Sequence, residues 1–263
     1  MTKMRQDLAD HYPNKLGFAS NLINLGRYWL RQAVYGLAPV RRRLEPKSTG
    51  STAKSWDTLL SSPQFSTYLG GTINVDAGNS AAATLIKFRA PPNPSVLDVG
   101  CCGGTLLAAL SSCSRYRGTD ISTFAIDEAR KTSQCLDHLQ LKRAHFEAID
   151  LREFKSSDMW DVIVFSEVLY YLGLEEAQRE VERYAEMLTP SGILVVAMKD
   201  DAKSKALFCG LTKRYHWADG LLWQRKPACP DYRTRISREC PSFLTGVLVR
   251  RQPDGVLATD QKL

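Results

Sequence analysis

Short apolar runs alternate with helical segments along most of this chain, and this alternation constrains the fold more than any other feature. Five apolar runs lie between residues 95 and 198: SVLDV, YRGTDI, AHFEAI, DVIVFS and GILVVAM. The segments between them, and residues 79–89 before them, have helical patterns. Strands that are apolar on both faces are typical of a parallel sheet covered by helices on both sides. The sequence therefore predicts an α/β fold with a doubly wound, mostly parallel sheet.

The segments near the two ends of the chain depart from this alternation. Near the C-terminus, RTRIS and FLTGVLVRR lie close together, and we expect them to pair as an antiparallel hairpin at the edge of the sheet. Near the N-terminus, residues 18–38 carry apolar side chains at helical spacing, and residues 45–55 have the composition of a linker. We therefore predict a basic helical extension and linker over residues 1–50 and one α/β domain over residues 51–263.

Basic charge is concentrated in the segments that flank the predicted sheet. Residues 1–47 contain 9 basic and 3 acidic side chains, whereas residues 48–198 contain 13 basic and 18 acidic ones. Such an uneven charge concerns partners rather than the fold. We expect residues 22–47 to pack as an ordinary helical segment, with weak association with an anionic membrane surface as the alternative. Polar residues interrupt this segment, so it does not favour a membrane span.

Cysteine usage and the N-terminal sequence bear on the compartment. The 7 cysteines are an odd number and lack the spacing, with histidines, that is typical of a zinc site. No apolar core follows a basic start, so a secretory signal is not predicted. These features favour reduced thiols in a cytoplasmic protein, with a membrane-peripheral position as the alternative. No cluster of carboxylates suggests a dedicated metal site, and we predict none.

The stretch VLDVGCCGG combines an acid at a strand end with a glycine-rich turn and a helix start. It lacks the G-x-G-x-x-G spacing of a dinucleotide-binding turn, and Asp98 points instead to a positively charged ligand. Asp120 ends the second strand, where a carboxylate can hold a ribose diol. Asp150 follows the third strand, where it can accept from an adenine amino group. A cationic centre, a ribose and an adenine together describe S-adenosylmethionine.

These motifs resemble those of the class I S-adenosylmethionine-dependent methyltransferases. Asp98, Gly100 and Gly104 match the ends of that family's acid and G-x-G-x-G motif, and Cys102 stands in place of the middle glycine. We expect the small Cys102 side chain to fit with a negative φ. The stretches WDVIVFSEVLYYL and LTPSGILVVAM are similar to bacterial small-molecule and glycan methyltransferases of the nodulation type. The resemblance implies a seven-stranded, Rossmann-like sheet and methyl transfer to O or N of a small molecule or glycan.

Candidate site residues follow from these motifs and from the resemblance. The predicted cofactor-binding residues are Asp98, Gly100, Cys101, Gly104, Asp120, Ile121, Asp150, Leu151 and Ser166. Tyr68, Tyr170 and Tyr171 are expected to shape the substrate side. Glu167, after the fourth strand, and His216 are the candidate general bases. A hydroxyl acceptor benefits from such a base, whereas a neutral amine needs little beyond alignment.

Two other functions stay open at this point. One is a nucleic-acid methyltransferase that uses the basic flanks, and the other is a noncatalytic binding protein of the same fold. The basic residues are scattered and no added recognition fold accompanies them, which argues against nucleic acid as the partner. Calorimetry with S-adenosylmethionine separates the noncatalytic protein from the two enzymes, and salt-dependent RNA binding separates the nucleic-acid enzyme from the small-molecule enzyme.

Overall fold

The fold is described from a computed structural model of the chain. The described residues are 53–61, 77–136, 144–224 and 242–251. The chain divides into two units, Met1–Leu44 and Glu45–Leu263, and every described residue belongs to the second unit. Residues 22–47 and Tyr68, both of which carry predictions, therefore lie outside the described residues.

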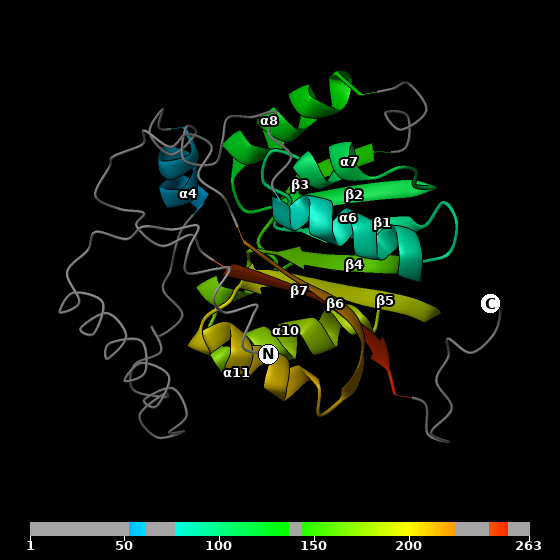
Figure 1. Cartoon of the computed structure of the whole chain (residues 1–263). Helices are drawn as coiled ribbons and strands as arrows, with labels where there is room; N and C mark the ends of the chain where they lie inside the picture. The colour runs from blue at the N-terminus through cyan, green and yellow to red at the C-terminus, as the bar shows by residue number, and fades with distance from the viewer. Residues whose placement is uncertain (1–52, 62–76, 137–143, 225–241, 252–263) are drawn as a thin grey trace, which may run out of the picture. The chain divides into compact units, whose positions relative to one another are not determined.

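A seven-stranded sheet with the order β3-β2-β1-β4-β5-β7-β6 forms the centre of the second unit (Figure 1). The strands are β1 (Ser95–Val99), β2 (Arg115–Asp120), β3 (Ala144–Ala148), β4 (Trp160–Ser166), β5 (Leu188–Lys199), β6 (Tyr215–Gln224) and β7 (Ser242–Arg250). Strands β1 to β5 pair in parallel, whereas β7 is antiparallel to both β5 and β6. The predicted doubly wound, Rossmann-like sheet with an antiparallel edge is confirmed.

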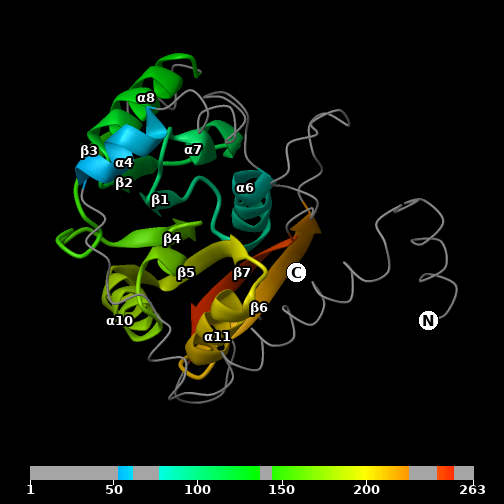
Figure 2. The same ribbon diagram turned by 90° about the vertical axis from the view of Figure 1, so that its left-hand side faces the viewer.

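Helices cover both faces of this sheet (Figure 2). One face carries α6 (Ala77–Arg89), α7 (Thr105–Ala109) and α8 (Thr123–Gln134), and the other carries α10 (Leu174–Ala185) and α11 (Ala202–Leu211). A short helix, α4 (Ala53–Leu60), contacts α8, and a 3-10 turn, η1 (Leu169–Tyr171), follows β4.

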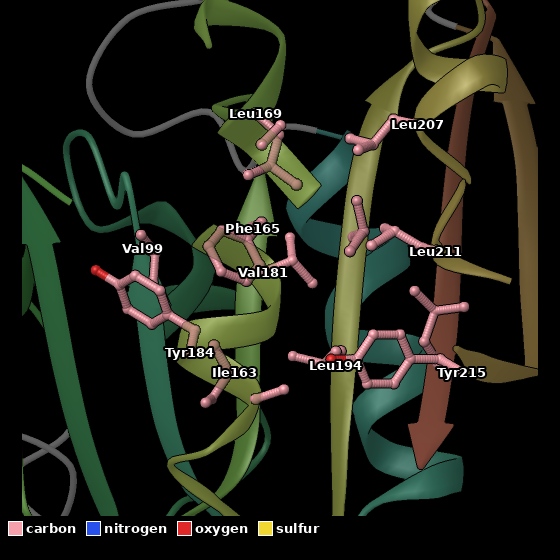
Figure 3. Close-up of a cluster of buried hydrophobic side chains, with 14 of the residues drawn as sticks. Val99, Ile163, Phe165, Leu169, Val181, Tyr184, Leu194, Leu207, Leu211 and Tyr215 are labelled. Atoms are coloured by element: carbon pink, nitrogen blue, oxygen red, sulfur yellow. The ribbon is translucent and has the colours of Figure 1, made fainter. Parts of the chain in front are cut away.

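Successive residues of the central strands enter two separate cores. In β1, Val96 packs with the helices α6 to α8, and Leu97 packs with α10 and α11. Figure 3 shows the second core, where Phe165 of β4 meets Val181 and Tyr184 of α10. This alternation explains why the strands are apolar on successive residues, because both of their faces are buried.

The hairpin at the sheet edge is not the predicted one. FLTGVLVRR forms most of β7, but its partner is β6, with the sequence YHWADGLLWQ, and RTRIS lies in residues 225–241, outside the described residues. A register shift between Trp217 and Asp219 interrupts the alternation of β6, which hides the strand in the sequence. The Trp217 ring also lies over Gly220 and Gly246, where any Cβ would collide with it.

Candidate cofactor site at the carboxyl edge of the sheet

The parallel register brings the ends of three strands to one edge. Val99, the last residue of β1, pairs with Thr119 of β2 and with Phe165 of β4. The next residues along these strands are Gly100, Asp120 and Ser166, which therefore meet at the carboxyl edge. This is where open α/β sheets bind their ligands.

The glycine turn between β1 and α7 is held to β2 by backbone hydrogen bonds. The Gly100 and Cys101 amides donate to the Thr119 carbonyl over 2.7 and 2.9 Å. Gly100 and Gly104 have φ of 76° and 75°, and a Cβ on Gly100 would lie 2.8 Å from Val168 Cγ2. At Gly103 a Cβ would meet nothing within 4 Å. The turn therefore needs glycine at its ends and has open space beside its middle.

Cys102 has a φ of 46°, so the expectation of a negative φ at this residue was wrong. The left-handed conformation is strained for a residue with a Cβ, which explains why a glycine fits the motif better. The Cys102 amide donates to Asp120 Oδ2 over 3.0 Å, and this contact depends on the turn's shape. Cys101 is buried, and burial raises the pKa of its thiol well above the ordinary value. Cys101 is therefore a packing residue of the turn.

Asp120 connects the turn to the start of α8. Its Oδ2 accepts from the Cys102 amide, and its Oδ1 accepts from the Ser122 amide over 2.9 Å. Burial raises the pKa of Asp120, while these two hydrogen bonds lower it. The adjacent Ile121 is half-buried. The carboxylate is thus fixed beside the turn, at the position predicted for a ribose-binding acid.

Asp98 lies beneath the turn and is only 2% exposed. Its Oδ2 accepts from the Tyr116 hydroxyl over 2.6 Å, whereas its Oδ1 is buried with no hydrogen-bond partner among the described residues. Burial raises the pKa of Asp98 to about 7, the Tyr116 hydrogen bond lowers it, and nearby Asp120 raises it. Asp98 is part of the site's floor, and it does not present an open carboxylate to a ligand in this structure.

Asp150 and Leu151 follow β3, as predicted, but both accept hydrogen bonds from other residues of the protein. Both Asp150 oxygens accept from Arg152, from its amide over 2.9 Å and from its Nη1 over 2.8 Å. The Arg152 Nε in turn donates to Glu176 over 2.8 Å. The Leu151 carbonyl accepts from Arg183 and from the Tyr184 hydroxyl. Both oxygens of the Asp150 carboxylate, which was predicted to contact an adenine, are therefore already hydrogen-bonded to Arg152.

The end of β4 brings the predicted acid and tyrosines to the same edge. Ser166 pairs with Ala197 of β5, and the Glu167 amide donates to the Ala197 carbonyl over 2.8 Å. Glu167 has a φ of 56°, a strained conformation that concentrates at functional sites. Tyr171 in η1 is 40% exposed, and its ring lies 4.7 Å from Trp56 of α4. Tyr170 lies in the same turn, but its side chain is outside the described set.

His216 is not at this edge. It pairs with Val249 of β7, which pairs with Ile193 of β5, a residue level with Val162 near the start of β4. The carboxyl edge lies at the other end of these strands, level with Ser166 and Ala197. The prediction of His216 as a general base is therefore corrected, because the sheet register separates it from the turn.

Two residues that the sequence did not single out also contact the site. Asn79 in α6 donates from Nδ2 to the Oγ1 of Thr105 over 2.5 Å, and Thr105 is the first residue of α7. Asn79 is 9% exposed, and its Oδ1 is buried with no partner among the described residues. Asp57 in α4 contacts the start of α8, beside Asp120. Both contacts join segments far apart in sequence, and no local pattern marks them.

The residues at this edge fit the predicted cofactor. The turn is open beside Gly103, the Asp120 carboxylate is held in place, and Asp98 and Asn79 each leave a buried oxygen without a protein partner in the described part of the chain. Such oxygens in native structures call for a ligand, a water or an ion. No group of three His, Cys, Asp or Glu residues in the described ranges has an arrangement that suits a metal ion.

Comparison with known proteins agrees with this geometry. Residues 97–194 match the model of a methyltransferase domain. A crystal structure of the N-methyltransferase NodS from Bradyrhizobium japonicum, in complex with S-adenosyl-L-homocysteine, superimposes with a TM-score of 0.58 at 18% identity, covering 76% of this chain and 98% of that one. Magnesium protoporphyrin IX methyltransferase from Synechocystis superimposes with a TM-score of 0.53 at 17% identity, covering 75% and 96%.

Two curated relatives resemble part of this chain in sequence. Nodulation protein S of Rhizobium tropici is 33% identical over 126 residues, which are 46% of this chain and 50% of the relative. The dTDP-3-amino-3,4,6-trideoxy-alpha-D-glucopyranose N,N-dimethyltransferase of Streptomyces venezuelae is 32% identical over 132 residues, 49% of this chain and 52% of the relative. The chain thus spans about half the length of the curated relatives that it matches. The predicted resemblance to nodulation-type methyltransferases is confirmed.

Proposed function

We propose that the protein is an S-adenosylmethionine-dependent methyltransferase that methylates O or N of a small molecule or glycan, with an amine as the favoured acceptor. The observation that supports this most strongly is the meeting of the glycine turn, Asp120 and the strained Glu167 at one edge of the sheet. In this arrangement Asp120 is available for the cofactor's ribose, and Glu167 lies beside the position proposed for the reacting groups. The sequence match over residues 97–194 supports the same conclusion.

In this proposal the cofactor lies along the turn from Gly100 to Gly104. Asp120 accepts hydrogen bonds from the ribose hydroxyls, and Asp150 with Arg152 borders the adenine. Ser166 and Glu167 border the reacting end, and Asn79 contributes a buried carbonyl oxygen near the turn. The cofactor supplies a methyl group already activated by a positively charged sulfur, so alignment of the acceptor provides much of the acceleration.

An amine acceptor fits the residues at the end of β4. With His216 at the far end of the strands, Glu167 is the candidate base that stays at the edge, and a neutral amine needs little base catalysis. The name of one curated relative supports nitrogen as the acceptor atom, since that relative is an N,N-dimethyltransferase of an amino sugar. Tyr171 and Trp56 give the acceptor side two aromatic rings, which suit the apolar face of a sugar.

The test is a pair of matched acceptors offered with labelled S-adenosylmethionine. Each pair consists of an amino sugar and the sugar that carries a hydroxyl at the same position. We expect label transfer to the amino sugars and at least about tenfold less to their hydroxyl counterparts. Transfer to the hydroxyl sugars alone would overturn the amine assignment. Cofactor binding without any transfer, across a screen of cell-extract fractions, would favour a noncatalytic binding protein.

The location of this activity is also a proposal. No helix in the described ranges is long and apolar enough to cross a membrane. We propose action in the cytoplasm, and we keep weak attraction of residues 22–47 to an anionic membrane surface as a hypothesis from their sequence. The charge of +7 concentrates outside the sheet-forming region and gives no reason to prefer nucleic acid as the acceptor.

A further inference from the structure

Helix α4 lies outside the methyltransferase-domain match, yet it contacts the candidate site on two sides. Its Asp57 bonds to the start of α8, which follows β2, and its Trp56 ring lies 4.7 Å from Tyr171, which follows β4. In the sheet, β2 and β4 are the two neighbours of β1. Two adjacent residues of α4 therefore connect the elements on either side of the glycine turn. Figure 2 shows α4 beside α8.

The contact of Asp57 is more extensive than a single surface hydrogen bond. Its Oδ1 accepts from Ser122 Oγ over 2.5 Å and from the Phe124 amide over 3.1 Å, and its Oδ2 accepts from Thr123 Oγ1 over 3.0 Å. The hydrogen bond from Ser122 is the main cause of a lowered pKa at Asp57. An ionised carboxylate at the start of a helix is also favoured by the exposed amides there. Asp57 is thus anchored as an anion at α8.

Ser122 links this anchor to the cofactor site. Its side chain is fully buried, its Oγ donates to Asp57, and its amide donates to Asp120 Oδ1 over 2.9 Å. The same Oγ accepts from the Ala125 amide over 3.1 Å, so Ser122 already caps α8 by itself. Asp57 adds an acceptor for a second amide of this helix start, that of Phe124. It also fixes the position of Ser122, and hence of the amide that holds the Asp120 carboxylate.

We infer that α4 belongs to the cofactor site and that Asp57 is a positioning residue, which holds Asp120 ready for the ribose hydroxyls through Ser122. This inference rests on the proposed function, because it assigns Asp120 to the ribose. It extends the site beyond residues 97–194 to α4, a helix that ends at Leu60, before β1 begins at Ser95. Asp57 itself contacts no ligand, and it acts only by positioning the Asp120 carboxylate through Ser122.

The experiment is a double-mutant cycle on the full chain, with S-adenosylhomocysteine affinity measured by calorimetry. The variants are Asp57→Ala, Asp120→Ala and both together. We expect Asp57→Ala to weaken binding about fivefold and Asp120→Ala about thirtyfold. The double variant should bind within about twofold of Asp120→Ala, because Asp57 acts only through Asp120. Independent contributions would instead multiply to about 150-fold and would overturn the inference.

Two further variants separate positioning from a merely structural contact. Asp57→Asn keeps an oxygen that accepts from Ser122, and we expect it to restore affinity to within about twofold of the unaltered chain. Asp127→Ala is the matched control, because Asp127 is an exposed acid of α8 that forms an ion pair with Arg130 on the same helix. It should leave affinity unchanged. Thermal unfolding of each variant reports whether the fold is intact.

The outcomes distinguish the inference from the proposed function. If Asp57→Ala lowers the melting temperature while S-adenosylhomocysteine affinity stays the same, Asp57 is a structural contact and the inference fails. Equal weakening by Asp127→Ala would show a general charge effect and would also refute it. If the unaltered chain does not bind S-adenosylhomocysteine at all, the proposed function fails, and the inference fails with it.

Discussion

One acid at each edge of the central sheet, half-buried Asp161 at the amino edge and buried Asp98 at the carboxyl edge, differs in its hydrogen bonding. At the amino edge, Asp161 accepts from the Ser95 amide over 2.9 Å, from Ser95 Oγ over 2.8 Å and from Thr189 Oγ1 over 3.2 Å. At the carboxyl edge, Asp98 accepts from Tyr116, and its second oxygen has no partner among the described residues. An acid with a full set of donors holds strands together. An acid that lacks donors belongs to a place that a ligand completes.

Backbone strain follows the same division. Cys102 and Glu167, both at the carboxyl edge, are non-glycine residues with positive φ. Asn93, before β1, has a φ of 58°, but asparagine adopts this conformation readily. Strain in residues that resist it is therefore confined, in the described part of the chain, to the edge that carries the candidate site. The comparison predicts that changes at the amino edge alter stability and that changes at the carboxyl edge alter binding.

The largest effect is expected from Asp161→Ala at the amino edge. The change leaves the Ser95 amide and hydroxyl without their acceptor, and we expect the free energy of unfolding to fall by about 3 kcal/mol, as for lost hydrogen bonds to a charged group. Urea denaturation measures this loss. S-adenosylhomocysteine affinity of the folded variant should stay within about twofold. A variant that unfolds normally but binds poorly would break the comparison.

Asp120→Ala at the carboxyl edge should give the converse result. We expect S-adenosylhomocysteine binding to weaken by about 2 kcal/mol, which is the scale of leaving ribose hydroxyls and two backbone amides without an acceptor. Calorimetry measures the affinity, and denaturation of the same sample should show a smaller change than Asp161→Ala does. Equal affinities of the variant and the unaltered chain would remove Asp120 from the site.

Asp98→Asn tests whether the buried acid is held neutral. Burial raises the pKa of Asp98 to about 7, above the value of about 3.9 in an unfolded chain, so the folded protein keeps a proton that the unfolded chain loses. The contribution of this group to stability therefore falls as pH rises from about 4 to about 7 and is constant above that. Asparagine stays neutral and lacks this dependence.

We expect Asp98→Asn to gain stability relative to the unaltered chain between pH 5 and pH 8, by on the order of 2 kcal/mol. Urea denaturation across that range measures the difference. The matched control is Asp161→Asn, which leaves Asp98 in place and should therefore keep the pH dependence that Asp98 contributes. Parallel stability curves for Asp98→Asn and the unaltered chain would show that Asp98 is ionised throughout.

Cys102→Gly addresses strain within the turn. Glycine adopts a φ of 46° without a Cβ clash, so we expect a gain in the free energy of unfolding of about 1 kcal/mol or less, because glycine also loses more entropy on folding. The Cys102 amide stays in place for Asp120, and S-adenosylhomocysteine affinity should change by less than about twofold. A large loss of binding would assign the Cys102 thiol a direct role at the site.

The sequence predicted those parts of the site that a local pattern encodes. An apolar run, an acid and a glycine turn lie within a few residues, and parallel pairing then aligns Asp120 and Ser166 with Gly100. Asn79 and Asp57 could not be predicted in this way, because their partners are 26 and 65 residues away in sequence. β6 was missed because its register shift breaks the alternation, and His216 was misassigned because it lies in this unrecognised strand.

The smallest effect is expected from removing the N-terminal segment. The residues assigned to the cofactor, and Asp57, which positions one of them, all follow Ser51. A chain beginning at Ser51 should therefore bind S-adenosylhomocysteine within about twofold of the full chain. If the shorter chain fails to fold, the predicted domain boundary is wrong. The comparison of the two edges would then have to include a contribution from residues 1–50.

The same pair of chains tests the membrane hypothesis. Arg27, Arg31 and the cluster from Arg41 to Arg43 would each add on the order of 1 kcal/mol of attraction near an anionic surface. Sedimentation with anionic liposomes at low and high salt measures this attraction, which should weaken with salt in the full chain alone. That salt-sensitive difference is the result expected if residues 22–47 bind the surface. We expect the other result, equal sedimentation of both chains, because a segment of this composition packs as an ordinary helix more often than it binds lipid. A salt-sensitive difference would instead assign residues 22–47 to the membrane surface, without moving any part of the cofactor site.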